Sequence, residues 1–493
     1  MDYALLLERF SSSVQRTWSA QRRLHAALRA AIQEGELAPG SRLLASRVLA
    51  QELGIARNSV VYAYEQLLSE GFLSSDRRGT VVNPIAQVAK QLQLPTTTLL
   101  SDFCLANRAE RVMPLPVAAE LTTGFAPGVP SLTDFPKALW RKSLDASWRH
   151  LTVSQLGYAD AAGEPLLRAA IADYLRASRG VICDADQVIV TDGTQSSLDL
   201  CAHALADAGD KVWMETPGYV GAQIAFRSAQ LNVIGITVDK DGIAPTEHDW
   251  QTHHPKFVYV TPSHQYPTGQ VLSLNRRLEL IQHARKHGTL LIEDDYDSEF
   301  RHGGPPLIAM QGLVPDAPVI YLGTFSKTMF PALRIAYLVL PKNLVPAMHS
   351  LVAKTSLRGR SADQICLAKF IRDGHFLTHL RRMRRLYKNR RDELVRLLQA
   401  QLGDVATVYG DTAGMHLSLC FHNTSWDDVT ISEHALTLGV VVPALSHHRV
   451  GRRLHAWSGL MLGYAQVPIE LMPALVEHLK SSIDWYRNEI DST

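Results

Sequence analysis

The chain has 493 residues, of which 46% are apolar and 20% are charged, with a formal net charge of +2. This length exceeds one ordinary hydrophobic core, so we expect two or three domains of a soluble globular protein. No apolar run reaches about eighteen residues, which excludes a membrane span. The start MDYALLLERF lacks the pattern of a signal peptide, and we expect a cytoplasmic protein.

Cysteine usage and net charge limit the disulfides, metal sites and partners that can be expected. Five scattered cysteines form no C-x-x-C pair and leave one over (Cys104, Cys183, Cys201, Cys366 and Cys420). This pattern argues against a disulfide framework and against a zinc site, so no metal is predicted. A net charge near zero indicates no partner, and any contact with nucleic acid must come from a local patch.

The first 83 residues predict three helices and a hairpin. Apolar residues recur with helical spacing within 14–34, 41–53 and 59–70, and a glycine closes each segment. Short extended runs follow at 72–73 and 80–82. Three helices and a small hairpin in this order are typical of a winged helix-turn-helix.

Basic residues in this region are all arginine. Up to Asn83 there are ten arginines and no lysine, against eight acidic residues. Arginine suits bidentate contact with phosphates and guanine edges. The candidate DNA contacts lie at the starts of the second and third helices and in the hairpin: Arg47, Arg57, Asn58, Ser59, Arg77, Arg78 and Thr80.

Residues 24–82 resemble the GntR-type winged helix. The resemblance rests on LRAAIQEGELAPGSRL, SRVLAQELG, ARNSVVYAYEQLLSEGFL and RRGTVV, in unbroken order. It implies a DNA-binding domain at 14–83, with Arg57, Asn58 and Ser59 at the major groove. The proline-rich, weakly periodic stretch 84–118 predicts a linker.

Residues 119–493 predict a second domain of the α/β class. Helical and strand-like segments alternate up to about residue 342, which is typical of a mostly parallel sheet. The rest, 343–493, predicts a smaller α+β part. The strand-like runs are QVIVTDG, KVWMETP, LNVIGITV, FVYVTPS, LLIEDD, VIYLG and IAYLVL in the larger part, then MHLSLCF, GVVVPA and GLMLGYA.

Candidate cofactor ligands follow several of these strands. Lys327, in GTFSKTMFPALR, comes after VIYLG, and a lysine amine in a pocket can form a Schiff base with an aldehyde cofactor. A buried Asp294 is suited to hold a pyridine nitrogen, Tyr296 its neighbouring oxygen, and Tyr219 to stack on the ring. The candidate phosphate ligands are Gly193, Thr194 and Gln195 at a helix start, with Thr324, Ser326 and Arg334.

From about residue 121 the chain resembles fold-type I pyridoxal-phosphate aminotransferases, and as a whole it resembles the MocR-type (GabR-like) transcription regulators. By this resemblance, Lys327 matches the lysine of the family's SK-T motif. The residues just named match the family's ring and phosphate ligands. It implies pyridoxal 5′-phosphate held by Lys327 as an internal aldimine. It also matches Tyr158 with a tyrosine that reaches the neighbouring subunit's phosphate, which implies a homodimer with a domain-swapped arrangement.

Two departures concern the effector. Tyr266 stands where aminotransferases carry asparagine in Asn-Pro-Thr-Gly, and Met461 stands where many members carry a carboxylate-binding arginine. Tyr266, Arg449, Arg452 and Arg453 are therefore candidate effector ligands.

The function these patterns favour is a DNA-binding regulator that senses a small amino compound, such as an ω-amino acid or a taurine-like molecule, through an external aldimine. Two alternatives stay open: a regulator that senses pyridoxal phosphate itself, and a working aminotransferase with a fused DNA-binding domain. Sustained enzyme activity is not expected, although half-reactions are chemically possible.

Overall fold

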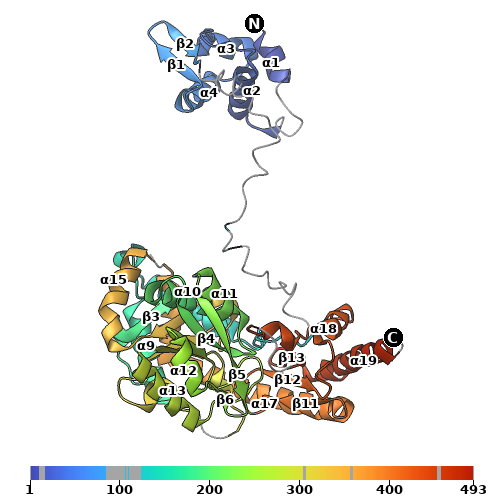
Figure 1. Cartoon of the computed structure of the whole chain (residues 1–493). Coiled ribbons are helices and arrows are strands. Elements are labelled where there is room, and N and C mark those ends of the chain that lie inside the picture. The colour runs from blue at the N-terminus through green and yellow to red at the C-terminus, as the bar shows by residue number, and fades with distance from the viewer. Residues whose placement is uncertain are drawn as a thin grey trace. The chain divides into compact units, whose positions relative to one another are not determined.

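The computed structural model describes residues 2–9, 17–84, 124–303, 307–355, 359–451 and 457–491, together with Ala106 and Ala109. The chain comprises two compact units, Met1–Leu105 and Ala106–Thr493 (Figure 1). The predicted linker, 84–118, lies outside the described residues except for Pro84 and those two alanines. No helix of the described segments is both long and apolar enough to cross a membrane.

The N-terminal unit is built from four helices and one hairpin. In chain order these are α1 (Tyr3–Arg9), α2 (Ala20–Glu34), α3 (Ser46–Leu53), α4 (Arg57–Ser69), β1 (Leu73–Asp76) and β2 (Gly79–Val82). The predicted helices and hairpin are present, but α2 begins at Ala20 rather than residue 14, and α4 begins two residues early. Helix α1 was not predicted from the sequence.

Apolar residues at helical spacing form the core of this unit. Leu24, Leu28 and Ile32 of α2 are buried against Leu49 of α3 and Leu67 of α4. The segment before α3 also extends the hairpin, because Leu43 N donates to Thr80 O at 2.9 Å and Val82 N donates to Ser41 O at 3.0 Å. These bonds fix the hairpin against the helices.

The second unit contains an eight-stranded sheet. Its strands are β3 (Val188–Thr191), β4 (Lys211–Thr216), β5 (Asn232–Asp239), β6 (Gly242–Ile243), β7 (Phe257–Val260), β8 (Leu290–Asp295), β9 (Val319–Thr324) and β10 (Ala336–Val339). The spatial order is β3-β10-β9-β8-β7-β4-β5-β6. The run β9-β8-β7-β4-β5 is parallel, whereas β10 is antiparallel to both neighbours and β6 to β5.

Helices cover both faces of this sheet, which is why the strands read as continuous apolar runs. The α-helices described in this part of the chain are α7 (Lys137–Arg149), α8 (Val153–Leu156), α9 (Pro165–Arg179), α10 (Thr194–Leu205), α11 (Val220–Ser228), α12 (Glu247–His253), α13 (Leu274–His287), α14 (Met310–Leu313), α15 (Val345–Thr355) and α16 (Ser361–Arg372). On β7, Phe257 packs in the core formed with α10 and α11, and Val258 in the core formed with α12 and α13.

The C-terminal part of this unit carries a separate three-stranded sheet. It comprises α17 (His375–Leu402), β11 (Ala406–Tyr409), β12 (His416–Phe421), α18 (Asp428–Thr437), β13 (Gly459–Gly463) and α19 (Met472–Asp491). We call these elements the C-terminal part. Its strand order is β11-β12-β13. The expected extended run GVVVPA is not a strand, and only its Ala444 forms a bridge, to Leu460.

Candidate functional site

The carboxyl ends of β7, β8 and β9 open into one cavity of about 240 Å³. Parallel strands bring their carboxyl ends to the same edge, where α/β proteins place ligands. The lining residues are Pro127, Gly128, Thr194, Gln195, Tyr219, Tyr259, Thr261, Tyr266, Asp294, Tyr296, Asp297, Thr324, Ser326, Lys327, Pro331, Arg334, Met415 and His416. Most of the predicted cofactor ligands, and Tyr266 among the predicted effector ligands, therefore meet here.

Lys327 points into this cavity from the segment that follows β9. Its Nζ donates to Gly128 O at 2.6 Å. Burial lowers the pKa of Lys327, although the nearby carboxylates Asp297 and Asp294 act in the opposite direction. A lowered pKa increases the fraction of neutral, nucleophilic amine, which is the form that attacks an aldehyde.

Asp294 lies at the end of β8 and is 3% exposed. Its Oδ2 accepts a hydrogen bond from Tyr259 Oη at 2.7 Å, whereas its Oδ1 is buried without a partner. Burial raises the pKa of Asp294 to about 7, with the Tyr259 bond opposing and Asp295 adding to the rise. A cationic ring nitrogen at Oδ1 would satisfy this oxygen and favour the charged carboxylate.

The predicted phosphate ligands form a cradle at the start of α10. Gly193 adopts a φ of +103°, and a Cβ on it would lie 2.9 Å from the Arg334 guanidinium carbon. Ser326 N donates to Thr324 Oγ1 at 3.2 Å. The arginine, the hydroxyls and the first amides of α10 make a site suited to an anion.

Aromatic rings line the cavity beside Lys327. The Tyr266 ring lies 5.4 Å from Tyr219 and 5.9 Å from Tyr296, in edge-to-face contacts. It also lies 5.4 Å from His416 and 5.3 Å from His448. Burial raises the pKa of Tyr219 to about 12, so this phenol stays protonated at neutral pH.

Several predicted residues lie elsewhere or cannot be located. Tyr158 is 89% exposed and does not line the cavity. Arg449 is also outside the lining, and its Nη2 donates to Trp457 O at 3.0 Å. Met461 is buried within β13. Arg452 and Arg453 lie outside the described residues.

Other lining residues were not predicted as ligands. Asp297 follows Tyr296 directly, and its position beside a predicted site residue was a usable signal. His416 is the first residue of β12, and Gly128 precedes α7 by several residues. His416 and Gly128 reach the cavity only through tertiary packing, so no local sequence pattern could have predicted them.

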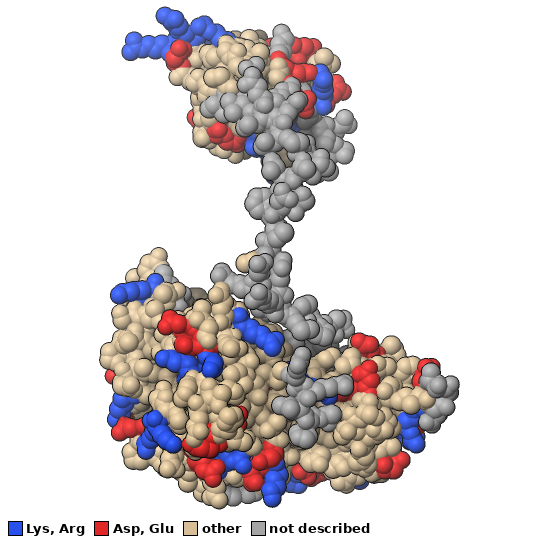
Figure 2. Space-filling model, in the orientation of Figure 1, with Lys and Arg blue, Asp and Glu red and all other residues tan. Residues whose placement is uncertain are grey.

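The predicted DNA contacts lie on the surface of the N-terminal unit. Arg47 lies in the first turn of α3, Arg57 and Asn58 begin α4, and Arg77 and Arg78 form the turn between β1 and β2; all five are exposed. Figure 2 shows basic side chains projecting from the tip of this hairpin. Ser59 and Thr80 are partly buried.

The other arginines of this unit are partly engaged within it. Arg29 Nε lies 3.5 Å from Glu70 and its guanidinium covers the Phe72 ring. By contrast, no side-chain bond or ion pair within the described part of this unit involves Arg47, Arg57 or Arg77. Their charges are therefore open to an anionic partner.

Comparison with known proteins finds a family for each of the two units. The family model for "Bacterial regulatory proteins, gntR family" matches residues 20–82, and that for "Aminotransferase class I and II" matches residues 125–479. The probable rhizopine catabolism regulatory protein MocR of Rhizobium meliloti is 38% identical over 472 residues, covering 94% of this chain and 93% of the relative. The chain belongs to the MocR family. This MocR-type protein is thus a GntR-type regulator with an aminotransferase-like domain.

Other relatives and solved structures fit this assignment. The MocR-type chain is 32% identical to the pyridoxine biosynthesis regulator PdxR of Corynebacterium glutamicum, over 89% of this chain and 90% of the relative. The regulator TauR of Rhodobacter capsulatus is 30% identical, over 77% and 80%. Among structures, α-aminoadipate aminotransferase LysN from Thermus thermophilus superposes with a TM-score of 0.71 at 24% identity, covering 78% of this chain and 98% of that one. This last likeness concerns the fold.

Proposed function

We propose that this MocR-type regulator binds pyridoxal 5′-phosphate in the cavity at Lys327, and that a small primary amine entering the same cavity alters its affinity for operator DNA. The observation that carries the proposal is the buried, unpartnered Oδ1 of Asp294 in one cavity with a lysine of lowered pKa. That pair suits a cofactor with a basic ring nitrogen and an aldehyde.

Each of the residues has a defined task in this proposal. Lys327 Nζ would hold the aldehyde carbon, and Asp294 would hold the ring nitrogen in its protonated form. The phosphate would lie among Thr194, Ser326 and Arg334. The bound cofactor supplies an aldehyde that condenses reversibly with primary amines.

The effector class follows from the cofactor's chemistry and the relatives. An amine of the effector would compete with Lys327 for the aldehyde, so Lys327 would not hold the cofactor while the effector is bound. We propose an ω-amino acid or a taurine-like amine as the effector. The name of PdxR favours the alternative in which pyridoxal phosphate is itself the signal.

The proposal extends to a homodimer with composite, domain-swapped sites. Tyr158 is 89% exposed on a single chain, which leaves its hydroxyl available to a neighbouring subunit. The N-terminal domain, 14–83, would then bind operator half-sites, with 84–118 as the linker and 119–493 as the effector domain. A dimer of this kind makes many phosphate contacts, so its DNA affinity falls steeply with salt.

Reconstitution tests the proposed function. We expect the cofactor-free protein to take up one pyridoxal phosphate per chain, with a new visible absorption band. A DNA fragment selected by the wild-type protein from a random pool then reports binding by fluorescence anisotropy. A panel of amines is expected to include one that changes both the band and the DNA affinity, the latter by about 5–150-fold. No visible band at millimolar cofactor would refute the proposal.

A second candidate function is aminotransferase turnover, because Lys327 and Asp294 are both in place. Incubation with an amino donor and a keto acid discriminates the two. Sustained product formation favours the enzyme, whereas one equivalent per chain indicates a half-reaction only.

The DNA surface leads to a separate prediction about Arg57. Arg57→Ala removes a guanidinium from the start of α4, where a recognition helix meets base edges. We expect binding to the selected DNA to weaken by about 1–3 kcal/mol. Arg29→Ala is the matched control, because the Arg29 charge is already engaged by Glu70. Equal effects of the two substitutions in anisotropy titrations would contradict this placement of the DNA.

A further inference from the structure

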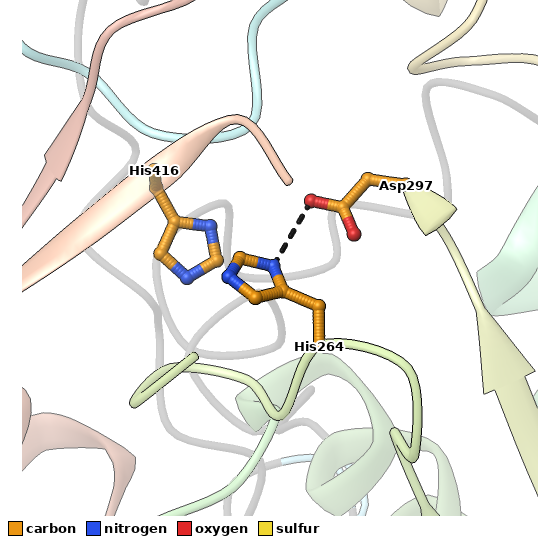
Figure 3. A group of neighbouring side chains, drawn as sticks. All are labelled: His264, Asp297 and His416. Atoms are coloured by element: carbon orange, nitrogen blue, oxygen red, sulfur yellow. Dashed lines mark hydrogen bonds and ion pairs between the residues drawn. The ribbon is translucent and has the colours of Figure 1, made fainter. Parts of the chain in front are cut away.

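A group of three buried side chains, two of which line the cavity, has no task in the proposed function. His264 follows β7, Asp297 follows β8, and His416 is the first residue of β12. His264 Nδ1 lies 3.2 Å from Asp297 Oδ2, and these side chains are 0% and 2% exposed (Figure 3). The His264 and His416 rings lie 4.7 Å apart. Segments far apart in sequence therefore meet at this point.

The three residue types are also those that bind transition metals, with ligand atoms within 4.8 Å of one another. The hydrogen bonds indicate a different role. His416 Nε2 lies 3.1 Å from the carbonyl of Pro267, which can only accept, so this nitrogen carries the proton. His264 Nδ1 faces the Asp297 carboxylate and is likewise the donor. His264 Nδ1, Asp297 Oδ2 and His416 Nε2 are thus used in hydrogen bonds, whereas His264 Nε2 and Asp297 Oδ1 are buried without a partner.

His264 holds the hydroxyl of Tyr296 at two points. Tyr296 Oη donates to the His264 carbonyl oxygen at 2.8 Å and lies 3.2 Å from His264 Nδ1. The imidazole N–H is therefore shared between the Asp297 carboxylate and the Tyr296 oxygen. Displacing the His264 ring would displace the Tyr296 hydroxyl, which lines the cavity.

Glycines of the C-terminal part fix the His264 ring from the other side. A Cβ on Gly414 would lie 2.2 Å from His264 Nδ1 and 2.6 Å from Asp297 Oδ2. A Cβ on Gly410 would lie 3.4 Å from His264 Nε2. Both glycines belong to the turn between β11 and β12. The ring is thus packed between the large sheet's loop and this turn.

We propose that His264 is a positioning residue for Tyr296, and that the His264–Asp297 pair transmits the position of the β11–β12 turn to the Tyr296 hydroxyl. The inference rests on the proposed function and on the role predicted for Tyr296, which is to hold the cofactor's ring oxygen. A shift of the C-terminal part relative to the large sheet then changes the hydrogen bond that this oxygen receives. The His264 imidazole is then one link between the cavity and the C-terminal part, which also lines the cavity through Met415 and His416.

A double-mutant cycle tests the positioning role in the cofactor-loaded protein. With the cofactor bound, the one Tyr296 proton would turn from the His264 carbonyl to the ring oxygen, and Tyr296 Oη would accept from His264 Nδ1. That bond stabilises the anionic form of the ring oxygen, so its loss raises the pH at which the visible band is half changed. We expect His264→Asn to raise this midpoint by about one pH unit or more. In a Tyr296→Phe background the same substitution is expected to have no further effect. Asp297→Asn, which keeps the imidazole, is expected to shift the midpoint in the same direction.

Gly414→Ala tests the link to the C-terminal part. The new Cβ would press on the His264 ring. Gly439→Ala is the matched control, because Gly439 has nearly the same φ (+78°, against +80° for Gly414) but its Cβ would meet nothing within 4 Å. We expect only Gly414→Ala to move the midpoint. If the wild type shows no band, the proposed function fails and not this inference. If the band forms but His264→Asn leaves its midpoint unchanged, or shifts it equally without Tyr296, the inference is wrong. A rise in melting temperature with Zn²⁺ that His416→Ala abolishes would replace it with a metal site.

Discussion

Lys327→Ala is expected to abolish the visible band that wild-type protein acquires with pyridoxal phosphate, and with it the response of DNA binding to amines. Lys327 is the one lysine among the residues that line the described cavity. Its Nζ, held by Gly128 O at 2.6 Å, is therefore the amine in reach of an aldehyde there. The phosphate cradle is untouched, so the cofactor is expected to bind weakly and to absorb as a free aldehyde.

The same variant separates sensing from DNA binding. The N-terminal unit has its own core, so Lys327→Ala is expected to retain DNA binding. Without amine, its affinity for the selected DNA fragment is expected to equal that of the wild type either with or without the amine. Lys354→Ala, on exposed surface of α15, is the control for a lost lysine and is expected to behave as wild type. A Lys327→Ala protein that keeps the wild-type band and amine response would remove Lys327 from the function.

The strands of the large sheet were predictable because both of their faces are buried. Runs such as VIYLG and FVYV have no polar alternation to confuse with a surface strand, and the structure has β9 and β7 there. The same criterion misled at GVVVPA, which is apolar because it packs in the core, although it forms no strand. Conversely, strand β11 was not predicted, because it is short and its residues alternate in burial.

The candidate site was predictable to the extent that its residues follow strands. Asp294, Tyr296 and Lys327 lie at or just beyond the ends of β8 and β9, and pattern alone brings them to one edge. Gly128 and His416 are distant from Lys327 in the sequence, and only packing brings them to it.

Arg179 is a further case in which position in the sequence misleads. It is the last residue of α9, where a basic side chain ordinarily faces solvent and the helix dipole. Instead its side chain is 3% exposed and lies 2.7 Å from Asp295 Oδ2, whose own side chain is 1% exposed. Arg179 also donates to Ser263 Oγ at 2.8 Å and to Leu307 O at 2.6 Å.

Arg179→Met is therefore expected to destabilise the second unit by about 3–5 kcal/mol, because it leaves the Asp295 carboxylate buried without its counter-charge. Seven of the eight tryptophans lie in this unit, so tryptophan fluorescence during urea unfolding measures the change. Arg176→Met, one turn earlier on the same helix and 49% exposed, is expected to change the unfolding free energy by less than about 0.5 kcal/mol.

The double variant Arg179→Met/Asp295→Asn decides the cause of that loss. If the uncompensated carboxylate is responsible, removing it as well recovers a large share of the stability. If the double variant is as unstable as Arg179→Met, the lost bonds to Ser263 and Leu307 are responsible instead. Either result concerns residues next to the cavity. Asp295 lies between Asp294 and Tyr296 in the sequence, and Ser263 directly precedes His264. One buried guanidinium thus holds the end of β8, which carries Asp294 and Tyr296, against the loop that carries His264.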